Sequence, residues 1–419
     1  MKIKSQSLLV NFSGYTIINL LNSLTPFIIL PILTRNLSKS DLGIIDIFTT
    51  SSLFLTPLIG LCLIQSLSKF YFSIKNRKAY LSTLFSSALI FSAGWLILVA
   101  VCLFSQNFIE LPSKTRWLIL CIIFYVCLNL IVEGFLLLKR NEENLRQFAS
   151  VRLLKASLDI GLTIFLLLFI DDYFLRVLGI TVSTAIAFLI VMYKLISKKA
   201  IVFEVKKEIL KKIFVFSLPL ILHTTFANIL NYADRYFILE ILGTATLGKY
   251  SVVYQLCMVI SLIINSFNMA WAPYFMKNMT RDHAKFRLKM KSWFCYYTGF
   301  LVLFALILFI LMPLIYKIYI GQGYEVNHWV YAGLLTAYFF NGMYRFKINY
   351  LFYYEDTKAI AKLSFIAALA SLSLCYILIP RFGLIGAAIS TLGSYFLLYA
   401  LLEVQLLKKR PYEGTLKNN

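Results

Sequence analysis

The sequence has few charged residues, and acidic ones are the scarcer kind. Of its 419 residues, 14% are charged and 60% are hydrophobic, whereas a soluble protein is about a quarter charged and about half apolar. A water-soluble fold of this size could not hide so much apolar surface, but a lipid bilayer can accept it on the outside of the protein. The composition therefore excludes an ordinary soluble domain.

Residues for metal or redox chemistry are also scarce. The three histidines, His223, His283 and His328, lie far apart and have no cysteine or carboxylate at metal-ligand spacing. The seven cysteines all fall in apolar stretches and form no C-x-x-C pair, which is typical of small buried side chains. We expect no metal site and no cofactor, apart from a coupling ion, H⁺ or Na⁺.

A nucleotide site is not expected either. Residues 243–250 read GTATLGKY, which is close to a phosphate-binding P-loop, but Tyr250 stands where a hydroxyl must bind magnesium. No strand precedes the stretch, as a P-loop requires. An ion gradient, the membrane potential or a substrate gradient would therefore supply the energy for any transport.

The long apolar runs that remain predict an all-α polytopic membrane protein of about twelve transmembrane helices. A spanning helix needs roughly 20 mainly apolar residues, and the runs are too continuous for the strands of a membrane barrel. The predicted spans are 11–33, 43–64, 80–104, 117–138, 150–170, 174–196, 213–239, 247–270, 292–316, 329–352, 359–380 and 383–407.

The basic residues indicate how the chain is oriented. Lys and Arg number 41 against 19 Asp and Glu, but they form short clusters between apolar runs rather than the single patch of a nucleic-acid-binding protein. Most lie in one alternating set of connections, which the positive-inside rule places in the cytoplasm together with both termini. The other, outer set holds Arg35, Lys39, Lys114, Arg116, Arg176, Arg235, Lys249, Lys317 and Arg381.

The chain matches itself at an offset of about 205 residues. Residues 37–43 read LSKSDLG and residues 242–248 read LGTATLG, each between the first and second predicted helix of its half. Residues 178–184 (LGITVST) and 385–391 (IGAAIST) match near the end of each half. The repeat predicts two six-helix bundles, 1–205 and 206–419, that enter the membrane the same way up.

Several stretches resemble the polysaccharide-biosynthesis branch of the multidrug/oligosaccharidyl-lipid/polysaccharide (MOP) exporter superfamily, which includes O-antigen and capsule repeat-unit flippases. The most distinctive is an Ile-Pro-x-x-Gly turn that leads into a helix of small residues. The stretches are LPILTRNLSKSDLG at 30–43, SLPLILHTTFANILNYADRYFI at 217–238, LGKYSVVYQL at 247–256, WAPYFMK at 271–277 and LIPRFGLIGAAISTLGSY at 378–395.

This resemblance implies a transporter rather than an enzyme. It also implies two six-helix bundles around a central cavity. Members of the branch flip undecaprenyl-pyrophosphate-linked glycans across the bacterial inner membrane, from the cytoplasmic to the periplasmic leaflet, by alternating access. The expected partners are this lipid-linked glycan, membrane lipids and other polysaccharide-assembly proteins. Two alternatives stay open: a cation-coupled multidrug-type exporter, which would need an acidic and aromatic cavity, and a membrane polysaccharide polymerase, which the short outer connections disfavour.

Polar residues at membrane depth are the candidate site residues, because a charge near the bilayer centre costs about 2.5–3.5 kcal/mol on insertion scales. Arginine donors match phosphate oxygens, whereas asparagine suits sugar hydroxyls. We expect Arg235→Ala and Arg345→Ala each to reduce surface polysaccharide while protein levels hold. The predicted substrate-binding residues are Arg35, Arg235, Arg345, Lys347, Asn19, Asn22, Asn228, Asn231 and Asn341.

Intramembrane acids are the candidates for ion coupling. A carboxylate that is dry in one state and wet in the other binds a cation or proton differently in the two. Glu133 and Asp159 are favoured, because both lie in the inner part of the first bundle. The structural alternative is that each pairs with a basic residue, such as Arg152 or Lys155 for Glu133. The predicted ion-coupling set is Glu133, Asp159, Asp46, Asp234 and His223.

Overall fold

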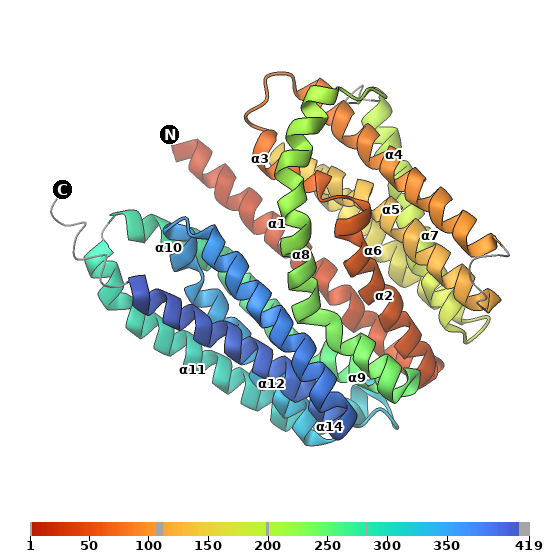
Figure 1. Cartoon of the computed structure of the whole chain (residues 1–419), viewed down its shortest axis with the longest axis vertical. Helices are drawn as coiled ribbons and strands as arrows, with labels where there is room; N and C mark the ends of the chain where they lie inside the picture. The colour runs from red at the N-terminus through yellow and green to blue at the C-terminus, as the bar shows by residue number, and fades with distance from the viewer. Residues whose placement is uncertain (1, 106–111, 198–200, 282, 410–419) are drawn as a thin grey trace. The chain divides into compact units, whose positions relative to one another are not determined.

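The computed structural model describes residues 2–105, 112–197, 201–281 and 283–409, and these ranges contain helices and connections but no strand (Figure 1). Contacts divide the chain into two compact units. The first unit comprises Met1–Leu37 and Ile44–Thr225, and the second comprises Ser38–Gly43 and Phe226–Asn419. These units are defined by contacts between residues, whereas the halves 1–205 and 206–419 are predicted from similarity within the sequence. The division into halves therefore stays a prediction.

The first unit is built from long helices with short connections. Its polar caps fix where two of them begin, because the Asn76 and Asn144 side chains accept hydrogen bonds from the backbone N–H groups of Ala79 and Gln147. The helices are α1 (Lys2–Asn36), α2 (Lys39–Ile59), η1 (Leu63–Ser66), α3 (Leu67–Phe70), α4 (Arg77–Phe104), α5 (Ser113–Asn141), α6 (Leu145–Leu167), α7 (Tyr173–Ser197) and the first part of α8 (Lys207–Leu242).

The second unit continues from within α8. It also holds the first residues of α2, where Ser38 and Asp41 form a reciprocal capping box through two 3.1 Å backbone–side-chain bonds. Its remaining helices are α9 (Thr244–Cys257), α10 (Val259–Arg281), α11 (His283–Ile315), the π-helical η2 (Tyr316–Ile320), α12 (His328–Lys347), α13 (Asn349–Tyr353) and α14 (Thr357–Lys409). Helices α11, α12 and α14 lie side by side (Figure 1).

The helices confirm an all-α membrane fold of about twelve spans. In the described ranges, nine helices are long and apolar enough to cross a membrane. Helices α6 and α12 fall outside that group because they carry charged and polar side chains at membrane depth. The 53-residue α14 contains two spans, because Gly383 breaks its helical geometry at φ 57° and ψ −133°, a backbone conformation that glycine adopts at little cost.

Each unit buries its own core while its outside stays apolar. In the first unit Tyr80 is completely buried and shares a 2.7 Å hydrogen bond with Ser66. In the second unit Trp271 and Phe346 stack at 4.4 Å between ring centroids. Leu189 and Ile310, on the outside of the two units, are 65% and 71% exposed. Side chains of this kind can pack against lipid, as the apolar composition of the chain predicts.

Two glycines at equivalent repeat positions touch each other within the second unit. A Cβ atom on Gly248 would lie 1.8 Å from the Lys39 carbonyl oxygen and 3.1 Å from the Gly43 backbone nitrogen. A Cβ atom on Gly43 would lie 2.1 Å from the Thr244 carbonyl oxygen. Helices α2 and α9 therefore meet backbone to backbone within the motifs 37–43 and 242–248.

Candidate functional site

A cavity of about 400 Å³ opens in the first unit between α1, η1, α5 and α6. Two predicted residues, Asn19 and Glu133, line it together with four further polar residues, Ser23, Gln65, Arg140 and Arg152. Arg140 is exposed in the last turn of α5. The cavity thus joins amide and charged groups, which can bind a polar ligand.

Glu133 is paired in this cavity. Its Oε1 accepts a hydrogen bond from the Arg152 guanidinium across α5 and α6. The Glu133 side chain is 43% exposed, so solvent also reaches the carboxylate. One turn earlier on α5, Asn129 accepts a hydrogen bond from Lys155, whose ammonium lies 5.5 Å from the Tyr125 ring centroid. In the structure Glu133 therefore pairs with a basic residue, Arg152, which is the structural alternative to a role in ion coupling.

Asp159 is paired more deeply. Arg176, on α7, donates to the Asp159 carboxylate on α6 and to the Thr163 hydroxyl, and both charged side chains are largely buried. A buried ion pair is held only when hydrogen bonds satisfy its polar atoms, and the threonine provides one of these. The two favoured coupling acids therefore each carry an arginine partner.

The second unit buries its own acid–base pair on α8. The Asp234 carboxylate lies 3.3 Å from the Arg235 guanidinium, and it accepts hydrogen bonds from the hydroxyls of Tyr250 on α9 and Thr391 on α14. Arg235 stacks at 4.1 Å over the ring centroid of Tyr254. Both charged residues are 4% exposed, so their neighbours within the unit neutralise and enclose them.

Asn231 belongs to the same buried cluster. Its side-chain oxygen accepts a hydrogen bond from the Tyr395 hydroxyl, and its backbone oxygen accepts one from Tyr254 at 3.1 Å. Three tyrosine rings, Tyr254, Tyr338 and Tyr395, follow one another at centroid distances of 5.8 and 6.5 Å. The cluster connects α8, α9, α12 and α14 and gives α8 a fixed rotation in the second unit.

Arg345 has a different environment. On α12, its Nε donates to the Asn341 side chain at 3.0 Å, and its Nη1 donates to Asn265 on α10. One turn further, the Asn349 amide lies 3.4 Å from the Asn268 side-chain oxygen. Within the described ranges, no carboxylate pairs with Arg345, so this half-buried guanidinium keeps its positive charge uncompensated.

Lys347, two residues on, is compensated. Its ammonium pairs with Glu403 on α14 and lies 4.2 Å from the Phe294 ring centroid. Arg345 and Lys347 therefore contact different neighbours although only one residue separates them in the sequence. An ion pair and an aromatic contact give Lys347 the character of a packing residue.

The other predicted residues lie apart from these clusters. Asn22 is half-buried on α1, Asp46 is half-buried on α2 and Asn228 is half-buried on α8. Arg35, at the end of α1, and His223, in the first-unit part of α8, are exposed. The predicted stripe His223–Asp234 therefore passes from an exposed position in one unit to a buried position in the other.

Sequence reasoning missed several partners of the predicted residues. The sequence predicts Arg176 only as an outer cation, and the pairing of Lys347 with Glu403 is not predicted. Asn265 and Asn268 were also missed, although two asparagines three residues apart in an apolar helix share one face, and this signal could have identified them. In the described ranges no group of His, Cys, Asp and Glu could hold a metal ion.

The sequence of this chain is similar to known proteins of one family. The family model "Polysaccharide biosynthesis protein" matches residues 8–279. The Haemophilus influenzae "Lsg locus putative protein 1" is 25% identical over 390 residues, which cover 89% of this chain and 93% of that protein. An uncharacterized membrane protein from the same organism is 24% identical over 369 residues, 85% of this chain and 86% of that protein.

Solved transporters have a similar fold. An inward-facing multidrug resistance MATE family transporter of the MOP superfamily aligns with a TM-score of 0.73 at 13% identity, over 95% of this chain and 96% of that one. The lipid II flippase MurJ, in an inward closed conformation, aligns with a TM-score of 0.67 at 13% identity, over 97% of this chain and 87% of that one. The chain belongs to the polysaccharide biosynthesis protein family and has the fold of MOP-superfamily transporters.

Proposed function

We propose that this protein is a flippase that moves undecaprenyl-pyrophosphate-linked oligosaccharide repeat units, of O-antigen or capsule, across the bacterial inner membrane. Transport runs from the cytoplasmic to the periplasmic leaflet by alternating access, with both termini in the cytoplasm. Membership of the polysaccharide biosynthesis family supports the glycan substrate. The similarity in fold to the lipid II flippase MurJ supports flipping.

Arg345 is the observation that carries the proposal. A pyrophosphate has concentrated negative charge, which cannot cross hydrocarbon without a cation beside it. Arg345 is half-buried and its side-chain bonds go to the neutral amides of Asn341 and Asn265. Its Nη2 group takes part in none of these bonds, so it can donate to a phosphate oxygen. Arg176 and Arg235, by contrast, are engaged by carboxylates.

The surroundings of Arg345 suit a glycan next to the phosphate. Asn265, Asn268 and Asn349 present amides beside the arginine, and amides can both donate to and accept from sugar hydroxyls. The stacked rings of Phe267, Tyr297 and Phe346 lie on α10, α11 and α12, and two of these helices also carry Arg345 and its asparagine partner Asn265. The polyprenyl tail stays in lipid during transport, because it needs no polar partner.

The acids of the first unit are our candidates for energy coupling. Glu133 and Asp159 each face an arginine, so H⁺ or Na⁺ would bind by displacing or loosening that partner. Such an exchange links ion binding to movement of α6 against α5 or α7. The pair Asp234–Arg235 offers the same chemistry in the second unit. Coupling at these acids remains a prediction.

The proposal is tested in cells that lack this protein and carry a plasmid copy of it. Wild-type protein should restore surface polysaccharide and clear undecaprenyl-linked glycan from the cytoplasmic leaflet, whereas Arg345→Ala should fail while membrane levels hold. Lys347→Gln is the matched control, because it also removes one cation from α12. Restored resistance to cationic dyes with no effect on glycan would favour a multidrug exporter, a function suggested by the likeness to the MATE transporter.

A further inference from the structure

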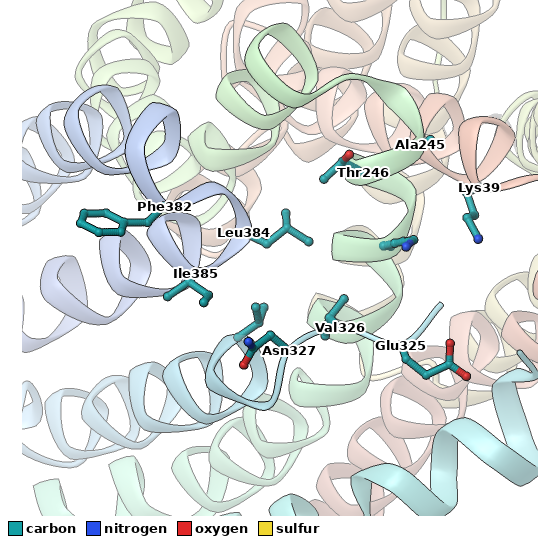
Figure 2. A pocket seen from close by; sticks show the side chains of 11 residues that line it. Lys39, Ala245, Thr246, Glu325, Val326, Asn327, Phe382, Leu384 and Ile385 are labelled. Atoms are coloured by element: carbon teal, nitrogen blue, oxygen red, sulfur yellow. The ribbon is translucent and has the colours of Figure 1, made fainter. Parts of the chain in front are cut away.

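A second cavity, of about 580 Å³, lies entirely in the second unit (Figure 2). It is enclosed by the first residues of α2 and α9, by residues 325–327 before α12 and by the break in α14. The orientation predicted from the basic residues places all these segments on the outer side of the membrane. None of them belongs to the clusters around Arg235 and Arg345, so this cavity is a separate feature of the fold.

The charged groups of this cavity are mainly positive. Lys39 and Lys249 line it, and Glu325 is the acidic residue among its lining. The Glu325 carboxylate accepts a 2.8 Å hydrogen bond from the Gly323 backbone N–H. The Lys39 ammonium lies 6.0 Å from the Tyr324 ring centroid. Within the described ranges neither lysine forms an ion pair, so both charges remain available to an anion.

Backbone amides add to this charge. Helix α9 begins beside the cavity, and the residue before it, Gly243, has no side chain that could cap the helix. Ala245 and Thr246, which line the cavity, lie in the first turn, whose N–H groups have no acceptor inside the helix. The helix dipole also favours an anion there. The stretch 243–250 thus presents a helix start preceded by Gly243, together with Lys249.

The opposite wall is apolar. Phe382, Leu384 and Ile385, at the break of α14, lie across the cavity from Ala245 and Thr246 (Figure 2). Val326, before α12, and Val330, on α12, add further apolar side chains to the lining. A site with cations on one wall and aliphatic side chains on the other matches an amphipathic anion better than an inorganic one, because free phosphate gains nothing from apolar contact.

We propose that this cavity binds the phosphate headgroup of an anionic lipid of the outer leaflet. Lys39, Lys249 and the first-turn amides of α9 hold the phosphate, and the α14 wall contacts the lipid chain. Two kinds of lipid carry this chemistry: a glycerophospholipid and a polyprenyl phosphate. The inference goes beyond the proposed function, because lipid binding at this cavity requires no transport.

Native mass spectrometry of the purified full-length protein tests this site. The protein is offered phosphatidylglycerol, undecaprenyl phosphate or, as a lipid without net charge, phosphatidylcholine. Retention of the first, the second or both should fall at least about tenfold in Lys39→Gln/Lys249→Gln, since each lysine contributes about 1 kcal/mol or more to anionic-lipid binding. Lys317→Gln is the matched control, because Lys317 is an exposed lysine on the same predicted side that does not line the cavity.

A variant that binds more strongly guards against misfolding as the explanation. Glu325→Gln removes the acidic lining residue and should increase retention of the same lipid severalfold, whereas Glu240→Gln, an exposed acid at the end of α8, should not. Loss confined to undecaprenyl phosphate would identify a carrier-lipid site, and equal loss of both anionic lipids would identify a general lipid-phosphate site. Retention that is the same in the double variant and in Lys317→Gln would overturn the proposal.

Discussion

Both units pair charges in their helices, but the second unit also holds a cation that no described carboxylate pairs. In the first unit, Glu133 and Asp159 each face an arginine across a helix–helix contact. In the second unit, Arg345 has only asparagine amides for side-chain partners. A closed ion pair contributes to the packing of helices, whereas an uncompensated cation is a cost that ligand binding can offset. The difference separates residues that hold the fold from the residue we assign to substrate.

The same contrast recurs within the second unit. Arg235 is 4% exposed, lies beside Asp234 and stacks on Tyr254, whereas Arg345 is half-buried and unpaired by any described carboxylate. From the sequence, both arginines were expected to tolerate alanine with protein levels unchanged. For Arg345 it stays a prediction, because alanine there leaves only the neutral amides of Asn341 and Asn265 without their partner. For Arg235 we now expect loss of protein, because its removal leaves a buried carboxylate without a cation.

The largest expected effect breaks the deepest pair of the first unit. Arg176→Ala leaves the Asp159 carboxylate buried and unpaired and should cost about 3–5 kcal/mol of stability. The midpoint temperature of unfolding in detergent measures this loss. Lys114→Ala is the control, because Lys114 is 71% exposed and its pair with Asp172 should contribute about 0–1 kcal/mol. Equal midpoints for the two variants would mean that the Asp159–Arg176 pair does not hold α6 against α7.

A smaller loss of stability is expected when a methyl group is added at a backbone contact of the second unit than when the Asp159–Arg176 pair is broken. Gly248→Ala places a methyl group 1.8 Å from the Lys39 carbonyl oxygen in the second unit, and forced overpacking of this kind costs about 1–3 kcal/mol or more. Gly161→Ala on α6 of the first unit should be neutral or stabilising, because nothing lies within 4 Å of its added carbon. Fluorescence-detected size exclusion of tagged protein would report both. A monodisperse Gly248→Ala with wild-type yield would disprove the close contact.

The smallest expected change in stability is at Glu133. Its side chain is 43% exposed, so Glu133→Gln should cost at most about 1 kcal/mol, less than any change at the Asp159 pair. If the acids couple transport to an ion, Glu133→Gln and Asp159→Asn should abolish the dependence of flipping on pH or Na⁺ in proteoliposomes. Wild-type ion dependence in both variants would place coupling elsewhere or leave the membrane potential to act on the charged substrate.

Much of the fold could be predicted, because membrane spans depend on runs of apolar residues along the chain. The break at Gly383 was visible in the Ile-Pro-x-x-Gly pattern, and the repeat motifs contained the glycines that touch. The charge partners could not be predicted. Lys347 pairs with Glu403, which lies 56 positions away. Asp159 on α6 pairs with Arg176 on the next helix, α7. Such pairs depend on how each helix is rotated against its neighbours, which hydropathy does not specify.

The candidate site was predictable in residue type but not in role. Arg345 and Lys347 look alike in the sequence, since both are cations near one end of a polar helix. Lys347 pairs with Glu403, whereas Asn265 and Asn341 bond to Arg345 without compensating its charge. The exposed His223 and the buried Asp234 likewise shared one predicted face. Their separation into different units follows from long-range packing.

The rate of flipping in proteoliposomes tests most directly whether Arg345 binds the pyrophosphate. The probe is a fluorescent undecaprenyl-pyrophosphate-linked disaccharide, and its access to a quencher outside the vesicles measures transport. Arg345→Ala should flip it about ten- to a hundredfold more slowly than wild type at an unchanged unfolding midpoint, because one charge-assisted contact is worth about 1.5–3 kcal/mol. Arg345→Lys should be intermediate, because lysine keeps the charge but loses the planar fork, and Lys347→Gln should stay near wild type. Arg345→Ala with the wild-type rate would contradict the account.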